Sequence, residues 1–188
     1  MDYKETFEHL FTKLNEPNDH YLCYGNYYGR LKDELNKYGK LVVAYDFDDT
    51  VYDFHNKGRS YTNIIELLRR LKNLDIAYLV VYTCSEKERY EEIKNYLIEN
   101  NIPFDSINEL PDEIKGKVPS GNKLYYNVLL DDRAGLDMPY NALSTLCLNI
   151  EERNRFIKES NKRILDLLLS DIIVNKKNNI ITFHKNTN

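Results

Sequence analysis

The sequence predicts an α/β fold of the doubly wound, Rossmann-like kind, a three-layer sandwich with a central parallel sheet. Apolar runs of strand length alternate with amphipathic helical patterns, which is typical of parallel strands joined by crossover helices. The strongest runs are apolar throughout, as expected of strands buried on both faces. Each also ends in a polar turn, and the carboxyl ends of parallel strands share one edge of a sheet. The first run begins at Leu41, and the other two occupy residues 76–82 and 124–130.

The first 38 residues precede the strongest strand and are predicted to be helical. Residues 3–14 place apolar side chains at helical spacing, and residues 28–38 do so more weakly. Residues 15–26, which contain Pro17, are expected to form a loop. Gly39 is a favourable helix stop just before the Leu41 strand. We therefore expect residues 1–38 to be a helical extension that is able to cover a site on the core.

Residues 39–150 carry the strand and helix alternation of the predicted catalytic core. After a polar loop at 52–60, Ser60 or Thr62 is a suitable cap for a helix that runs to Asn73. A charged helix opened by Ser85 or Glu86 follows the second strand and stops near residues 100–101. A short strand is expected at 103–107, and a loop at 108–122 leads into the third strand. Residues 146–150 are predicted to form a further strand.

Residues 151–188 are predicted to pack on that core as a separate C-terminal element. Residues 151–170 have the pattern of a long helix. Residues 172–183, interrupted by a polar stretch at 176–179, are interpreted as a terminal β-hairpin.

Composition narrows the classes of function. The chain has 188 residues and a formal net charge of -4, so non-specific attraction to nucleic acid is not favoured. Cys23, Cys84 and Cys147 are odd in number and form no CxxC pair, which indicates a reducing compartment. No apolar run is long enough to span a bilayer, and no signal peptide is evident. We expect a cytoplasmic protein without a membrane partner, and the sequence leaves homo-oligomerisation open.

The most informative segment is the end of the first strand, where Asp46, Asp48 and Asp49 follow an apolar run. Carboxylates this close repel one another and lose solvation at a strand end, so a divalent cation is a suitable partner. Thr83 ends the second strand and the pair Asp131-Asp132 ends the third. The three turns are expected to meet as an acid-rich metal and phosphate site.

Read together, Asp46-x-Asp48-x-Thr50, Thr83, Lys123 and Asp131-Asp132 resemble the motifs of the haloacid dehalogenase superfamily of phosphohydrolases. The resemblance covers residues 40–148. It implies that Asp46 is a nucleophile that forms an aspartyl-phosphate. It implies that Asp48 protonates the leaving group and then activates water.

The same resemblance implies roles for the remaining motif residues. Thr83 would hold a phosphate oxygen, with Ser85 assisting, and Lys123 would offset negative charge, with Lys117 as its competitor. The backbone of Phe47 and Asp48 would donate to the phosphate, and the Thr50 hydroxyl would orient the loop. Asp49 lies at a variable position of the motif. Arg133 could contact substrate or pair with a surface acid, and His55 could contact substrate or simply be an exposed loop residue. Magnesium would be held by the carboxylates of Asp46, Asp131 and Asp132 and the carbonyl of Asp48.

Three classes of function compete. A Mg²⁺-dependent phosphomonoesterase is preferred over a receiver-like phosphoacceptor switch, because a receiver places its acid pair before its nucleophilic aspartate. The third class is a non-catalytic binding protein that retains the fold. Only a loop and a helix lie between Val51 and Ile76, so the site is minimally capped, as in the branch without a cap domain. A phosphorylated small molecule, such as a nucleotide or sugar phosphate, is slightly preferred over polynucleotide or protein ends.

Overall fold

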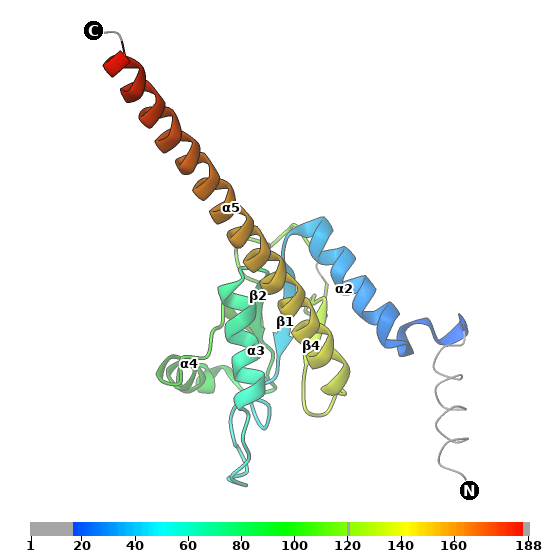
Figure 1. Ribbon diagram of the computed structural model, residues 1–188. Coiled ribbons are helices and arrows are strands. Elements are labelled where there is room, and N and C mark those ends of the chain that lie inside the picture. Colours follow the sequence, from blue (N-terminus) through cyan, green and yellow to red (C-terminus); the bar gives the residue numbers. More distant parts are fainter. Residues whose placement is uncertain (1–16, 120, 186–188) are drawn as a thin grey trace, which may run out of the picture. The chain divides into compact units, whose positions relative to one another are not determined.

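The structure of the protein is a computed structural model that describes residues 17–119 and 121–185. It is an α/β fold around a four-stranded parallel sheet of order β3-β2-β1-β4, which confirms the predicted Rossmann-like class. Figure 1 follows these elements along the chain. The predicted helix at residues 3–14 lies outside the described residues. The strands are β1 (Leu41–Tyr45), β2 (Ala77–Val81), β3 (Ser106–Ile107) and β4 (Val128–Leu130).

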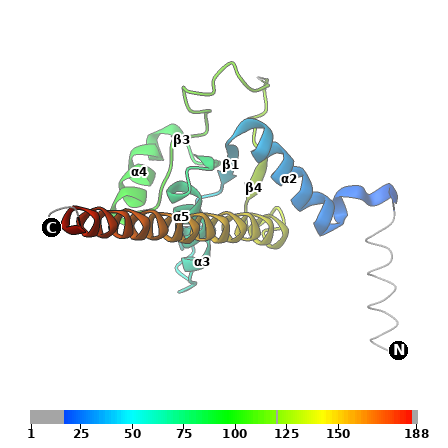
Figure 2. The same cartoon turned by 45° about the horizontal axis from the view of Figure 1, so that its top comes forward.

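The helices before β4 lie near the positions that the apolar periodicity indicates, with differences at their first residues. The segment expected to be a loop before the first described helix contains a 3₁₀ turn, and that helix begins earlier than predicted. In two views the helix α4 lies on the β3 side of the sheet and α2 on the β4 side (Figure 1 and Figure 2). The helical elements are η1 (Pro17–Leu22), α2 (Tyr24–Tyr38), α3 (Thr62–Asn73), η2 (Lys87–Arg89), α4 (Tyr90–Glu99) and α5 (Asp137–Lys185).

The helix α2 ends at the predicted glycine and packs on the sheet. Gly39 has a positive φ of 78° and its amide donates to the Leu35 carbonyl, which closes the helix. Leu31 and Leu35 are buried. Arg30 Nη2 donates to the carbonyl of Asn127 at 3.1 Å, which joins α2 to the segment before β4. These contacts place α2 in the same compact unit as the sheet.

The register of the sheet brings the ends of three strands to one level. Tyr45, the last residue of β1, is paired with Val81 of β2 and with Leu130 of β4. All residues of β1 are buried, as expected of the central strand of a parallel sheet. The polar turns after β1, β2 and β4 therefore begin at the same carboxyl edge, as the sequence predicted.

Strand β4 is shorter than the predicted strand at 124–130. Leu124, Tyr125 and Tyr126 pack instead against a cluster of Val42, Val80 and Ile114. Asn127 pairs with Val42 through its backbone amide at 2.9 Å and its side-chain Oδ1 at 2.6 Å, and β4 begins at the next residue. The apolar residues before Asn127 are thus partly buried against the sheet without joining it.

The C-terminal region is one helix, and two strand predictions there are wrong. Residues 146–150 lie within α5, where Ala142, Leu143, Leu146 and Cys147 are buried. Spacings of one and four residues belong to a single helix face, and they outweigh the short apolar run that suggested a strand. Residues 172–183 are helical as well and form no hairpin. The intervening stretch 176–179 has neither glycine nor proline to make a hairpin turn.

The chain divides into two compact units, residues 1–147 and residues 148–188. The sheet and every predicted site residue belong to the first unit. Among the described residues, no helix is long and apolar enough to cross a membrane. Cys23, Cys84 and Cys147, all within the described residues, form no disulfide bond.

Candidate active site

Asp46 is the first residue beyond β1 and is half-buried at the carboxyl edge of the sheet. Its amide donates to the Leu130 carbonyl at 2.9 Å, which holds it beside the end of β4. Burial, together with the smaller effect of the charges of Asp131 and Asp132, raises the pKa of its carboxyl group to about 6. Hydrogen bonds from the Phe47 amide and the Thr50 hydroxyl act in the opposite direction. The surroundings of Asp46 therefore disfavour its charged form.

The Thr50 hydroxyl links the two acidic turns. Thr50 is 1% exposed, and its Oγ1 donates to Asp46 Oδ2 at 3.3 Å. The same oxygen accepts a hydrogen bond from the Asp132 amide at 3.2 Å. One buried hydroxyl thus uses its donor and its acceptor to hold the turn after β1 against the turn after β4.

The loop between Asp46 and Tyr52 is tightly closed. The Phe47 carbonyl accepts from the amides of Val51 and Tyr52 at 3.1 and 3.0 Å. Asp49 has a positive φ of 59°, which aspartate tolerates better than most residues. The Phe47 side chain is 2% exposed and stacks on the Tyr52 ring, with centroids 5.1 Å apart. The backbone of Phe47, and not its ring, is therefore the part that faces the site.

Asp48 does not stand free. Its two carboxylate oxygens accept hydrogen bonds from Arg89 Nη1 and Nη2 at 2.8 and 3.1 Å. The Arg89 guanidinium also lies 5.2 Å from the centroid of the Phe54 ring. The pair is only partly buried, with side chains 23% and 29% exposed. Asp48 is thus held by a residue that the motif pattern did not indicate.

Thr83 is buried in a hydrogen-bonded turn after β2. Its Oγ1 donates to Ser85 Oγ at 3.1 Å and accepts from the Ser85 amide at 3.1 Å. Asn108 holds the Thr83 backbone at both ends, with Oδ1 accepting from the amide at 2.9 Å and Nδ2 donating to the carbonyl at 2.6 Å. Ser85 Oγ also accepts from Arg89 at 3.0 Å. Thr83, Ser85 and Asp48 therefore belong to one connected group.

The structure separates the two candidate lysines. Lys117 borders a cavity that also contains Lys40 and Val42, at the amino edge of the sheet. Lys123 lies with its amine 5.2 Å from the centroid of Tyr126, a ring 6.1 Å from that of Tyr82. Tyr82 directly precedes Thr83, so these contacts lead from Lys123 toward the carboxyl edge. Within the described part of the chain, no hydrogen bond or ion pair joins Lys123 to the acids.

The charges of Asp131 and Asp132 act on Asp46, but the described acidic side chains are not arranged as a metal site. Asp131 Oδ1 accepts the Arg133 amide at 2.8 Å, so this carboxylate also orders its own turn. Over residues 17–119 and 121–185, no group of three or more acidic, histidine or cysteine side chains has the geometry of a metal site. The donor chemistry nevertheless fits a hard cation, because carboxylate oxygens are its preferred ligands and the charges of Asp131 and Asp132 add to burial in raising the pKa of Asp46.

Asp49 belongs to the loop and not to the acidic group. Its carboxylate contacts His55 Nδ1 and accepts a hydrogen bond from the Tyr61 hydroxyl at 3.3 Å. These partners tie the turn to the start of α3 and use both oxygens. His55 therefore has a structural partner in this arrangement.

Arg89 and Asn108 are the two residues of this site that the sequence did not reveal. Arg89 lies in the charged run Glu86-Lys87-Glu88-Arg89, which is typical of a solvated helix start. Asn108 begins a stretch that predicts only a loop. Asn108 has a positive φ of 53°, which asparagine often adopts in turns. An asparagine in a loop therefore does not by itself indicate a functional residue.

Comparison with known proteins adds one distant neighbour. No protein-family model and no curated protein matches the chain. A solved structure of a conserved protein from Bacteroides thetaiotaomicron is similar at 22% identity and a TM-score of 0.41. The similarity covers 50% of this chain and 77% of that one.

Proposed function

We propose that the protein is a Mg²⁺-dependent phosphomonoesterase of the haloacid dehalogenase type. The observation that carries the proposal is the Thr50 hydroxyl between Asp46 Oδ2 and the Asp132 amide. It ties an acid with a pKa raised to about 6 to the turn of two further acids. This is an anionic centre that would accept a cation and present one carboxylate to a phosphoryl group.

Asp46 would attack phosphorus through a carboxylate oxygen while the bond to the leaving alkoxide breaks. Asp48 would give its proton to that alkoxide and then take a proton from the water that attacks the aspartyl-phosphate. Thr83 and the Phe47 backbone would hold phosphate oxygens, with Lys123 offsetting their charge. Magnesium, held by the carboxylates of Asp46, Asp131 and Asp132 and the Asp48 carbonyl, would screen the nucleophile from the incoming anion.

The Arg89 contact sets a condition on this chemistry. Each oxygen of Asp48 accepts one hydrogen bond from the guanidinium and keeps a second lone pair, and a general acid must carry a proton on one of these oxygens. Separation from Arg89 would free Asp48 for proton transfer. The partial exposure of the pair keeps the cost of separation near that of a surface salt bridge, at most about 1 kcal/mol.

The decisive experiment measures phosphate release from a panel of nucleotides, sugar phosphates and phosphorylated oligonucleotides, with Mg²⁺ and with EDTA. We expect release from a small phosphomonoester that requires Mg²⁺ and disappears in Asp46→Asn. Asp49→Asn, at a neighbouring acid whose carboxylate contacts His55 and Tyr61, serves as the matched control and should retain activity.

Two results would redirect the assignment. A stable acyl-phosphate on Asp46 without turnover would indicate a phosphoacceptor switch. Lack of Mg²⁺-dependent release from every substrate, with folding of both variants intact, would indicate a binding protein.

A further inference from the structure

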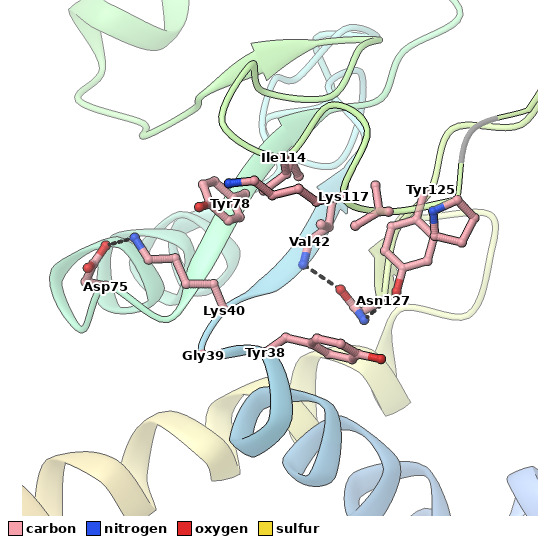
Figure 3. A pocket seen from close by; sticks show the side chains of 12 residues that line it. Tyr38, Gly39, Lys40, Val42, Asp75, Tyr78, Ile114, Lys117, Tyr125 and Asn127 are labelled. Carbon is pink, nitrogen blue, oxygen red and sulfur yellow. Dashed lines mark hydrogen bonds and ion pairs between the residues drawn. The ribbon is translucent and has the colours of Figure 1, made fainter.

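A cavity of about 560 Å³ opens at the amino edge of the sheet, on the side opposite the acidic turns. Its wall includes Lys40 and Val42 at the start of β1 and Lys117 from the loop before β4 (Figure 3). Four residues of extended strand, at about 3.3 Å each, separate Val42 from Asp46 by roughly 13 Å. The cavity is therefore distinct from the candidate active site.

One side of the cavity is rigid because Asn127 is fully engaged. Its Oδ1 accepts the Val42 amide at 2.6 Å, and its Nδ2 donates to Glu34 at 2.9 Å and to the Tyr125 hydroxyl at 3.1 Å. Both amide hydrogens are used, so Asn127 has no donor left for a ligand. Glu34 is itself neutralised by two hydrogen bonds from Arg30. This wall gives shape and contributes little hydrogen-bonding capacity of its own.

The charge at the cavity is incompletely balanced. Two lysines and one aspartate border it, and Asp75 is paired with Lys40. Among the described residues, no hydrogen bond or ion pair engages the Lys117 amine. Figure 3 shows the Lys117 side chain extending across the cavity toward Tyr78. A cation that faces a cavity without a protein partner favours an anionic group of a ligand.

Aromatic rings supply the remaining recognition. Tyr38, Tyr78 and Tyr125 border the same cavity, and Val42 and Ile114 add apolar surface. The Tyr78 ring makes a cation–π contact with Lys40, whose Nζ lies 5.2 Å from the ring centroid. Ring faces of this kind bind planar groups by stacking. The volume lies within the range of about 300–1,000 Å³ that is usual for small-molecule sites.

We propose that this cavity binds a small planar aromatic anion of the size of a nucleoside monophosphate. Lys117 contacts the anionic group, and the tyrosine rings contact the planar group. The proposal does not depend on phosphatase activity, because none of these residues belongs to the acidic site.

The test is isothermal titration of the full chain in EDTA with adenosine 5′-monophosphate, adenosine and inorganic phosphate as separate probes. We expect the monophosphate to bind at a ratio of one to one and about tenfold or more tighter than either part alone. Lys117→Ala should weaken that binding about tenfold, as loss of a charged hydrogen-bond donor does. Lys117 is exposed, so this substitution leaves folding intact.

Two control variants and one further variant of the cavity locate the site. Lys115→Ala removes a nearby lysine that is paired with Glu109 and Asp112 and should not change affinity. Tyr38→Ala, at a residue 62% exposed, should weaken the monophosphate and leave phosphate unaffected. Asp131→Asn should also leave affinity unchanged. Lack of binding, phosphate binding as tightly as the monophosphate, or affinity that follows Asp131 and ignores Lys117 would each overturn the proposal.

Discussion

Arg89 donates two hydrogen bonds to the carboxylate of Asp48, although the two residues are 41 positions apart in the chain. The contact joins the turn after β1 to the 3₁₀ turn η2, which follows β2. The guanidinium also lies over the rings of Phe47, Tyr52 and Phe54, with centroid distances from 5.2 to 5.9 Å. Arg89 therefore connects a candidate proton donor to an aromatic cluster.

Truncation of Arg89 should lower the stability of the protein moderately. Arg89→Ala removes a partly exposed ion pair and several cation–π contacts, for an expected loss of about 1–2 kcal/mol in the free energy of unfolding. Urea denaturation measures this loss. Lys87→Ala, in the same charged run, is the control, and an equal loss in both variants would show that the Arg89 contacts contribute nothing specific.

Removal of the Thr50 hydroxyl should destabilise the acidic edge. Thr50→Val keeps the shape of the side chain but leaves the Asp132 amide without its acceptor, which costs about 1–3 kcal/mol for a buried group. Thr50→Ser keeps the hydroxyl and should lose clearly less stability. Denaturant unfolding of the two variants tests this difference. Equal stability of the two would mean that the hydroxyl does not carry the link.

Asp46 should make the metal-free protein less stable as pH rises from about 4 to about 6. Its pKa is raised from the ordinary 3.8 to about 6 in the folded protein, so the folded state holds the proton more tightly than the unfolded chain. The folded state therefore gains an advantage at low pH that is lost as pH rises through the folded pKa. After allowance for solvent screening, we expect about 1–2 kcal/mol.

Comparison with Asp46→Asn isolates this effect from other carboxyl groups. The unfolding free energy of the variant, minus that of the wild type, should increase between pH 4 and pH 6 in EDTA. A difference that stays constant across this range would show that the Asp46 pKa is not raised.

Asn108 should be required for the shape of the turn at Thr83. Asn108→Ala removes partners of the Thr83 amide and carbonyl and also places alanine at a positive φ. We expect a loss of about 2–3 kcal/mol in the free energy of unfolding. Asn108→Gly relieves the backbone strain and should recover about 1 kcal/mol of this loss. If glycine restored full stability, the hydrogen bonds to Thr83 would have no weight.

The features that sequence predicted well have short-range causes. The strands β1 and β2 are buried, and their apolar composition predicts this directly. Gly39 predicts a helix end because glycine readily adopts the positive φ that closes the helix. The common edge followed from a rule about parallel strands and required no knowledge of contacts. Placement of Asp46, Thr83 and Asp131 at that edge was therefore predictable.

The errors arose where a local pattern allowed two structures. An apolar run such as residues 124–126 suits both a strand and a segment that covers a sheet, and its packing on Val42, Val80 and Ile114 exists only in the tertiary structure. Residues 172–183 are rich in β-branched side chains, yet they continue α5 as a helix. Propensity is a weak guide where no turn residue breaks the chain.

By itself, the sequence determined the class of fold, the order of its main strands and helices up to β4, and the acids that gather after the strands. These properties depend on periodicity and on residues adjacent in the chain. Only the tertiary structure decided which partners those acids have: Thr50 between Asp46 and Asp132, and Arg89 on Asp48. Such pairs form between turns that are distant in sequence, and their geometry exists only after the sheet has aligned the strand ends.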